Sequence, residues 1–156
     1  MARTEYYDDP QAPKANSIVP AVTVFVLDAH DRVLLIRRTD NGLWAIPGGA
    51  QDFGEYIAET AVRETKEESG INVEITGVVG VYTDPKHVMA YSNGEVRQQF
   101  SICFRAHYIS GDPTPSSESS EVCWVTKDDL ESLPIHPSMR LRIEHGYERR
   151  PQPYIG

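Results

Sequence analysis

The most informative stretch of this chain covers residues 47–71, which read PGGAQDFGEYIAETAVRETKEESGI. It opens with a proline and two glycines, and successive glycines let the backbone approach a ligand closely because neither carries a side chain. Residues 55–69 contain neither glycine nor proline, and Gly70 follows them as a typical helix end. The stretch therefore predicts a glycine turn, a short loop and a helix.

Three glutamates of the predicted helix point in one direction. At about 100° per residue, Glu64, Glu67 and Glu68 share an arc of about 100°. A neighbouring face of small residues is expected to pack on a sheet, and it consists of Ala58, Ala61, Val62 and Thr65. Like charges at this spacing repel each other. The arc is therefore either a solvated face, partly neutralised by Arg63 and Lys66, or a site for a hard divalent cation that prefers carboxylate oxygens.

The order and spacing of these residues resemble the signature of the Nudix hydrolases, the MutT-like family. Five residues separate Gly49 from Glu55, and seven more separate Glu55 from the segment RETKEESGI at 63–71. Thr65 departs from the family pattern, which usually has an aliphatic residue there. The resemblance implies an α/β fold, a single-domain Nudix α/β/α sandwich with a mixed central β-sheet.

The same resemblance implies an activity and a metal. Family members hydrolyse a nucleoside diphosphate linked to another moiety X with the help of Mg²⁺ or Mn²⁺. By analogy, Glu67 and Glu68 are the expected principal ligands and Glu64 is an additional one. The carbonyl of Gly49 is expected to complete the set, and all three glutamates count as candidate catalytic residues.

Further roles follow from position. Glu55 and Arg63 are expected to form a structural pair that holds the loop and the helix in register. A general base must lie within reach of the attacking water, and the sequence leaves two candidates open. One is Glu64 itself, and the other is Glu118, in a loop rich in proline and serine from which several relatives bring a further carboxylate to the metals.

Substrate contacts are expected from three side chains. Arg38, at the end of a predicted strand, resembles the phosphate-contacting arginine of some relatives. His87 lies in a loop that we expect on the path of the substrate, and Phe53 is a candidate for stacking on a base. The hairpin at residues 84–97 is the expected selectivity element, because loops on a rigid scaffold usually carry specificity.

Two other functions share this fold. One is a regulator that binds nucleotides but has lost catalysis, although none of the carboxylates of the signature is missing here. The other is pyrophosphohydrolysis at the 5′ end of RNA, which would need a basic groove. The sequence leaves open which nucleobase and which moiety X the substrate carries.

Composition limits the partners. The chain has 156 residues, enough for one domain, and a formal net charge of −8, which argues against long nucleic acid and anionic membranes as partners. Two cysteines are too few for a disulfide framework. No segment suits a signal peptide or a membrane span. We expect a cytoplasmic protein, a monomer or homodimer, acting on a small nucleoside diphosphate derivative.

Hydrophobic patterning predicts the remaining elements. Residues 1–17 are expected to form a loose arm and residues 18–156 the Nudix domain. Strands are expected at 18–28, 32–38, 43–46, 73–82, 87–91, 95–108 and 122–126, and short helices at 127–132 and 137–145.

Overall fold

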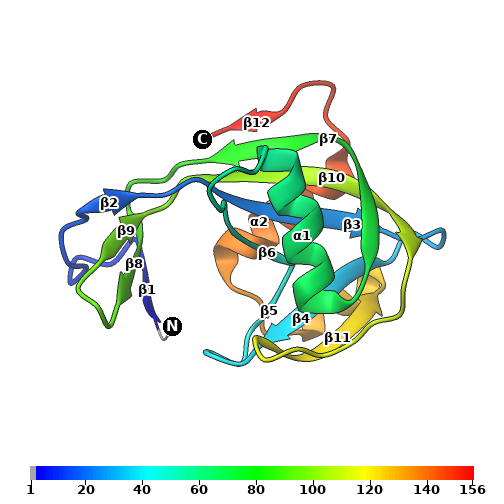
Figure 1. Cartoon of the computed structure of the whole chain (residues 1–156), viewed down its shortest axis with the longest axis horizontal. Coiled ribbons are helices and arrows are strands. Elements are labelled where there is room, and N and C mark those ends of the chain that lie inside the picture. The colour runs from blue at the N-terminus through cyan, green and yellow to red at the C-terminus, as the bar shows by residue number, and fades with distance from the viewer. Residues whose placement is uncertain (1–2) are drawn as a thin grey trace.

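The core of the protein is a mixed β-sheet (Figure 1). The structure, a computed structural model, describes residues 3–156. In these residues the strand order is β11-β4-β3-β10-β7-β12, with β5 paired to β4 and β6 to β3. The strands are β3 (Ala21–Leu27), β4 (Val33–Arg38), β5 (Trp44–Ala45), β6 (Gly48–Ala50), β7 (Asn72–Tyr82), β10 (Ser101–Ser110), β11 (Ser119–Val125) and β12 (Tyr154–Ile155). Strand β10 runs parallel to β3 but antiparallel to β7, so the predicted mixed sheet is confirmed.

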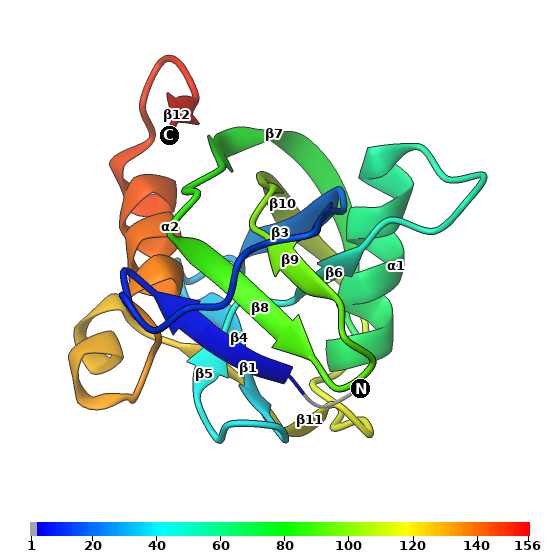
Figure 2. The ribbon, with the colours of Figure 1, turned by 90° about the vertical axis from the view of Figure 1, so that its left-hand side faces the viewer.

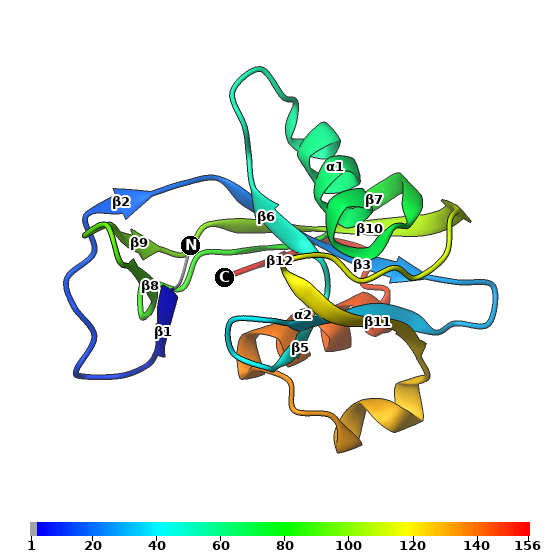
Figure 3. The same ribbon diagram turned by 60° about the horizontal axis from the view of Figure 1, so that its bottom comes forward.

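Two α-helices cover opposite faces of this sheet. Figure 3 shows α1 (Ile57–Ser69) on one side and α2 (Pro137–Glu148) on the other, with the 3₁₀ helix η1 (Lys127–Ser132) below β11. Helix α1 ends at Gly70, whose φ of 77° lies in the left-handed region that favours glycine. The predicted α/β/α layering is confirmed. No helix among the described residues is long and apolar enough to cross a membrane.

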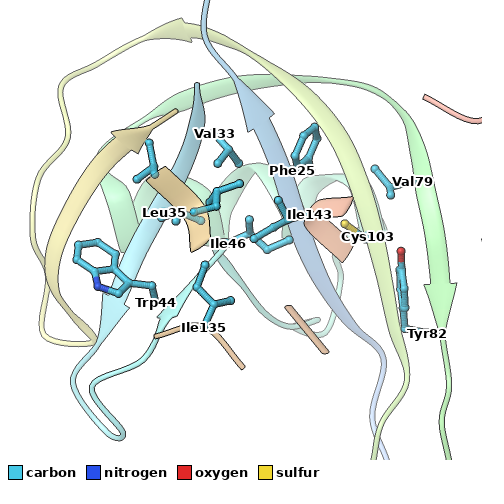
Figure 4. Packing of buried hydrophobic residues seen from close by; sticks show 12 residues of the cluster. Phe25, Val33, Leu35, Trp44, Ile46, Val79, Tyr82, Cys103, Ile135 and Ile143 are labelled. Carbon is cyan, nitrogen blue, oxygen red and sulfur yellow. The ribbon is translucent and has the colours of Figure 1, made fainter. Parts of the chain in front are cut away.

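Alternation along the strands produces two hydrophobic cores. In β3, Val22, Val24 and Val26 pack toward α1, whereas Phe25 faces the α2 side. Successive side chains of a strand point to opposite faces, so an uninterrupted apolar run serves a sheet that is covered on both sides. Figure 4 shows the α2-side core, in which Phe25 lies near Ile143.

The N-terminal segment corrects one expectation. Residues 3–7 form strand β1 (Arg3–Tyr7) instead of a loose arm, and β1 pairs antiparallel with β8 (His87–Tyr91). With β9 (Val96–Gln98) and β2 (Ser17–Ile18), these strands build a second, four-stranded sheet in the order β1-β8-β9-β2. Figure 2 shows β1, β8 and β9 of this sheet side by side. The strand depends on a partner 80 or more residues away, which a local pattern cannot reveal. Residues 1–2 lie outside the described part.

The strand expected at residues 95–108 is also interrupted. Its first part is β9 in the small sheet, and its second part is β10 in the large sheet. The chain crosses between the sheets at residues 99–100, where the carbonyl of Phe100 accepts a hydrogen bond from Ala21. The small sheet therefore stands beside one end of the large one (Figure 1).

Helix α1 is rotated from the expected orientation. Val62, expected on the packed face, is 37% exposed, whereas Thr65 is fully buried. The Thr65 hydroxyl donates to the carbonyl of Ala61 at 2.8 Å, so the polar residue at this usually aliphatic position is satisfied within the helix. The rotation turns Glu68 into the protein, where it is 5% exposed.

Candidate active site

Strand β6 brings the glycine turn against helix α1. It pairs antiparallel with β3, with Gly49 opposite Val22. A Cβ atom on Gly49 would collide with the carboxylate of Glu64, so glycine alone permits this approach. The turn and the first glutamate of the predicted ligand set are thus in direct contact.

Glu68 is the most deeply buried glutamate of the predicted set. Its Oε1 atom accepts a hydrogen bond from the backbone N–H of Gly48 at 2.8 Å. Burial raises the pKa of Glu68 to about 8; the Gly48 hydrogen bond opposes the shift, and the charges of Glu64 and Glu118 add to it. A nearby cation stabilises the charged form of a carboxylate, so this environment suits a positively charged ligand.

Glu64 and Glu67 share a partner in Arg63. The Nη1 atom of Arg63 donates to Glu64 at 2.9 Å and to Glu67 at 3.2 Å. Burial is the main cause that raises the pKa of Glu64. Glu67 is the outer member of the set, with its side chain 58% exposed. The three glutamates thus form a series from the protein interior to the solvent.

The side chains of Glu55 and Arg63 are in two-point contact. Nε of Arg63 donates to Oε2 of Glu55 at 2.7 Å, and Nη2 donates to Oε1 at 3.0 Å. The Asp52 N–H and the Thr60 hydroxyl donate to the same Oε1 atom. The hydrogen bond from Arg63 is the largest of the causes that lower the pKa of Glu55 to about 2. These bonds tie the loop that follows β6 to the helix.

A cavity of about 620 Å³ opens above the glycine turn, and we call it the outer cavity. It is bordered by the turn, by α1 and by the ends of β4 and β11, and it brings together Gly49, Glu64, Glu68, Arg38 and Glu118. These residues come from four separate segments of the chain. Five of the positions expected to act in chemistry or substrate binding therefore face one space.

Arg38 and Glu118 border the outer cavity from segments other than α1. Nε and Nη2 of Arg38 donate to the two oxygens of Asp40, at 2.9 and 2.6 Å. Glu118 lies in the loop before β11, and its carbonyl accepts from the Thr39 N–H at 3.2 Å. The charge of Glu118 reaches both Glu64 and Glu68, since it contributes to raising the pKa of each.

His87 and Phe53 lie elsewhere. His87 borders a deeper cavity of about 130 Å³, the inner cavity, and its Nε2 is 2.6 Å from Oε2 of Glu5. Phe53 is fully exposed in the loop between β6 and α1, which projects from the body of the protein (Figure 3), and it borders neither cavity. The structure therefore does not place Phe53 at the candidate site.

Sequence reasoning missed several residues that border these cavities. Arg3 borders both cavities, Glu5 borders the inner one and Asp40 the outer one. Tyr91, which also borders both, was not missed, because it lies in the hairpin at residues 84–97 that was predicted to carry selectivity. A signal for Arg3 and Glu5 was present, because residues two apart in a strand point to the same side. It becomes informative only once residues 3–7 are recognised as a strand.

The carboxylates fit a hard divalent cation. Glu64, Glu67 and Glu68 offer oxygen donors of the kind that Mg²⁺ and Mn²⁺ prefer. The missing Cβ of Gly49 leaves the backbone open beside them. Burial raises the pKa of Glu68, and within residues 3–156 no arginine or lysine lies within ion-pair distance of its carboxylate.

A second cluster, Glu5, His87 and His136, places one ligand atom of each residue within 4.8 Å of the others. The backbone N–H of Ser138 donates to Nδ1 of His136 at 3.1 Å. The Nε2 atom of His136 therefore carries the proton and offers no lone pair toward Glu5. This hydrogen bonding suits a buried polar cluster better than a metal site.

Glycine turn, glutamate helix and layered sheet together define a hydrolase of the Nudix type. The family model described as NUDIX domain matches residues 18–145. A MutT-like protein of Streptomyces ambofaciens is 34% identical over 80% of this chain and 75% of its own length. An ADP-ribose pyrophosphatase of Methanocaldococcus jannaschii is 34% identical over 74% of this chain and 65% of its own length. The chain belongs to the Nudix hydrolase family.

The fold agrees with solved structures. The crystal structure of an ADP-ribose pyrophosphatase from Streptococcus suis matches with a TM-score of 0.70 at 21% identity, over 90% of this chain and all of that one. This similarity concerns the fold alone.

Proposed function

We propose that this protein is a Mg²⁺- or Mn²⁺-dependent pyrophosphohydrolase that cleaves a nucleoside diphosphate linked to a further moiety. One observation carries the proposal. The buried carboxylate of Glu68, hydrogen-bonded to the N–H of Gly48, lies with Glu64 at the border of a cavity large enough for a diphosphate. A buried, uncompensated carboxylate costs free energy unless a positive charge accompanies it.

The residues divide into cation holders and phosphate binders. Glu64, Glu67, Glu68 and the carbonyl of Gly49 would hold the cation. When bound, the cation neutralises the diphosphate and lowers the pKa of a water molecule. Arg38 would donate to phosphoryl oxygens from the end of β4, in the charge-assisted contact typical of arginine.

We assign the general base to Glu118. Glu64 is already bonded to Arg63 and lies against Gly49. Glu118 borders the same cavity from a different segment of the chain. A carboxylate on that side can accept the proton of the attacking water while the helix glutamates hold the cation.

ADP-ribose is the first substrate to test, because a relative that is 34% identical is named an ADP-ribose pyrophosphatase. The full panel adds nucleotide sugars, dinucleoside polyphosphates, NAD(H), dNTPs and capped RNA, with Mg²⁺ or Mn²⁺ and with products identified by mass. Release of a nucleoside monophosphate and a phosphorylated X moiety supports the proposal. Tight binding of these compounds without hydrolysis at any metal concentration would support the regulator instead.

Selectivity is proposed to come from the small sheet. The hairpin of β8 and β9 supplies Tyr91, which borders both cavities, and His87 and Arg97, which border the inner one. Small molecules remain the expected substrates, since the chain has a net charge of −8. Exchange of residues 84–97 for the corresponding hairpin of a relative should change the substrate preference.

A further inference from the structure

The inner cavity extends the candidate active site into the protein. It shares Arg38, Gly48 and Glu68 with the outer cavity and continues to β3, β10 and α2. Its volume is about 130 Å³, compared with about 620 Å³ for the outer cavity. The smaller space suits a compact polar group.

Buried polar atoms without a hydrogen-bond partner gather at this cavity. In residues 3–156, the buried side-chain nitrogen and oxygen atoms that lack a partner are Oγ1 of Thr23, Oγ of Ser101 and Nε of Arg142. All three residues border the inner cavity, and their exposed fractions are 5%, 1% and 1%. Thr23 has only the thiol of Cys103, a weak hydrogen-bonding group, beside its hydroxyl. Buried polar groups normally have partners, so this concentration marks a place that receives one.

The environment of Arg142 indicates the charge of the missing hydrogen-bond partner. Its Nη1 donates to the carbonyl of Ser138 at 3.2 Å, and its Cζ lies 4.6 Å from the ring centre of Tyr82. Within the described chain no carboxylate lies within ion-pair distance of the Arg142 guanidinium. Arginine keeps its charge in proteins, and an isolated buried charge is strongly unfavourable. The partner that the guanidinium of Arg142 lacks is therefore an anion.

Arg142 is the free cation of the inner cavity. Four arginines and two glutamates border this cavity. Three of the arginines already pair with carboxylates, Arg3 and Arg38 with Asp40 and Arg97 with Glu95. One of the glutamates, Glu68, belongs to the proposed cation site, and the other, Glu5, lies 2.6 Å from His87. Within residues 3–156, Arg142 is therefore the arginine of this lining that has no carboxylate partner.

We propose that the inner cavity is an oxyanion subsite that takes a phosphoryl or carboxylate group, with Arg142 as the cation and Ser101 and Thr23 as hydroxyl donors. The shared border with the outer cavity places this group on the substrate, at a point distal to the cleaved diphosphate. The assignment of this group to the substrate rests on the proposed function, whereas anion binding by the inner cavity does not. The preferred substrates therefore carry an additional acidic group.

Anion binding is tested without catalysis. Inorganic phosphate and acetate are titrated into the full chain in EDTA, at constant ionic strength, and followed by calorimetry and thermal melting. The variants are Ser101→Ala, which removes one donor, and Arg142→Met. Arg140→Met is the matched control, because Arg140 lies on the same helix, binds the carbonyls of Leu130 and Leu133, and does not border the inner cavity.

We expect saturable phosphate or acetate binding, weakened roughly 3- to 10-fold by Ser101→Ala and 10-fold or more by Arg142→Met, with the control unchanged. The probe that binds more tightly shows whether the subsite prefers a phosphoryl or a carboxylate group. If Arg142→Met does not fold, Ser101→Ala carries the test. Equal binding by wild type and Ser101→Ala, or no saturable binding by the wild type, would overturn the subsite.

The substrate step uses a matched pair, ADP-ribose and its 2′-phosphorylated form. We expect the wild type to prefer the phosphorylated compound in kcat/KM by about 10-fold and Ser101→Ala to lose most of that preference. Hydrolysis with no preference would overturn the substrate assignment. Hydrolysis of neither compound and of no member of the panel, with phosphate binding intact, would contradict the proposed function and leave the anion subsite supported.

Discussion

The carboxylate of Glu68, on helix α1, accepts a hydrogen bond from the backbone N–H of Gly48, on strand β6, at 2.8 Å. This bond connects two elements that meet only in the folded chain. It fixes the direction of a carboxylate whose pKa burial raises to about 8. Such preorganisation is what a metal ligand requires, since partners around the ligands orient them.

Neighbouring glycines should respond differently to alanine. A Cβ on Gly49 meets the end of the Glu64 side chain, which can move, whereas a Cβ on Gly48 meets the backbone carbonyl of Val22, which cannot. We predict that Gly49→Ala changes the melting temperature little but weakens Mg²⁺-dependent activity about 10- to 100-fold. Gly48→Ala should lower the free energy of unfolding by about 1–3 kcal/mol. Thermal melting measures the loss of stability, and titration of activity with Mg²⁺ measures the loss of metal-dependent activity. The same effect of both variants on both quantities would contradict this geometry.

Replacement of the proposed base should affect turnover more than metal binding. We predict that Glu118→Gln lowers kcat by about 10²- to 10⁴-fold, because the proton of the attacking water loses its acceptor. The Mg²⁺ concentration for half-maximal activity should change little. Glu121→Gln is a suitable control, because Glu121 follows in β11 and pairs with Arg37 outside both cavities. Full activity of Glu118→Gln would move the role of base to Glu64.

Acid should remove a stabilising interaction of the N-terminal strand. Burial opposes ionisation of Glu5, but the hydrogen bond from His87 and the charges of Arg3 and His136 outweigh it and lower the pKa of Glu5 to about 2. A carboxyl with a lowered pKa stabilises the fold above its unfolded value of 4.5, and this contribution is lost as the pH falls from 4.5 toward 2.

The predicted consequence concerns the variant Glu5→Gln. Above about pH 5 it should be less stable than the wild type by about 2–3 kcal/mol. The difference should narrow steadily between pH 4.5 and 2. Urea unfolding at a series of pH values measures it, and a difference independent of pH would show that the charge of Glu5 is not the stabilising factor.

The helix of the signature was predictable because it depends on a local pattern, and the layered fold followed from the resemblance of that signature to the Nudix family. The apolar run of β3 and the segment between Glu55 and Gly70 identify their structures without distant partners. Strand β1 could not be found in this way, because it depends on β8. The split between β9 and β10 likewise depends on which sheet each part joins.

The candidate site also has a part that the sequence predicts and a part that it does not. The spacing of the signature identifies Glu64 and Glu68, and the structure brings both to the outer cavity with Glu118 and Arg38. The cluster of Thr23, Ser101 and Arg142 at the inner cavity was not predictable. It combines residues from β3, β10 and α2, and the burial of Arg142 without a carboxylate partner is visible only in three dimensions.

The most direct measurement of the central claim is Mg²⁺-dependent release of AMP from ADP-ribose, or from the best substrate of the panel, by the wild type and by Glu68→Gln. The glutamine keeps the size of the side chain and an oxygen for the Gly48 N–H. We predict a fall in kcat/KM of about 100-fold or more, with the circular dichroism spectrum unchanged. Turnover by Glu68→Gln equal to that of the wild type across the Mg²⁺ range would contradict the account.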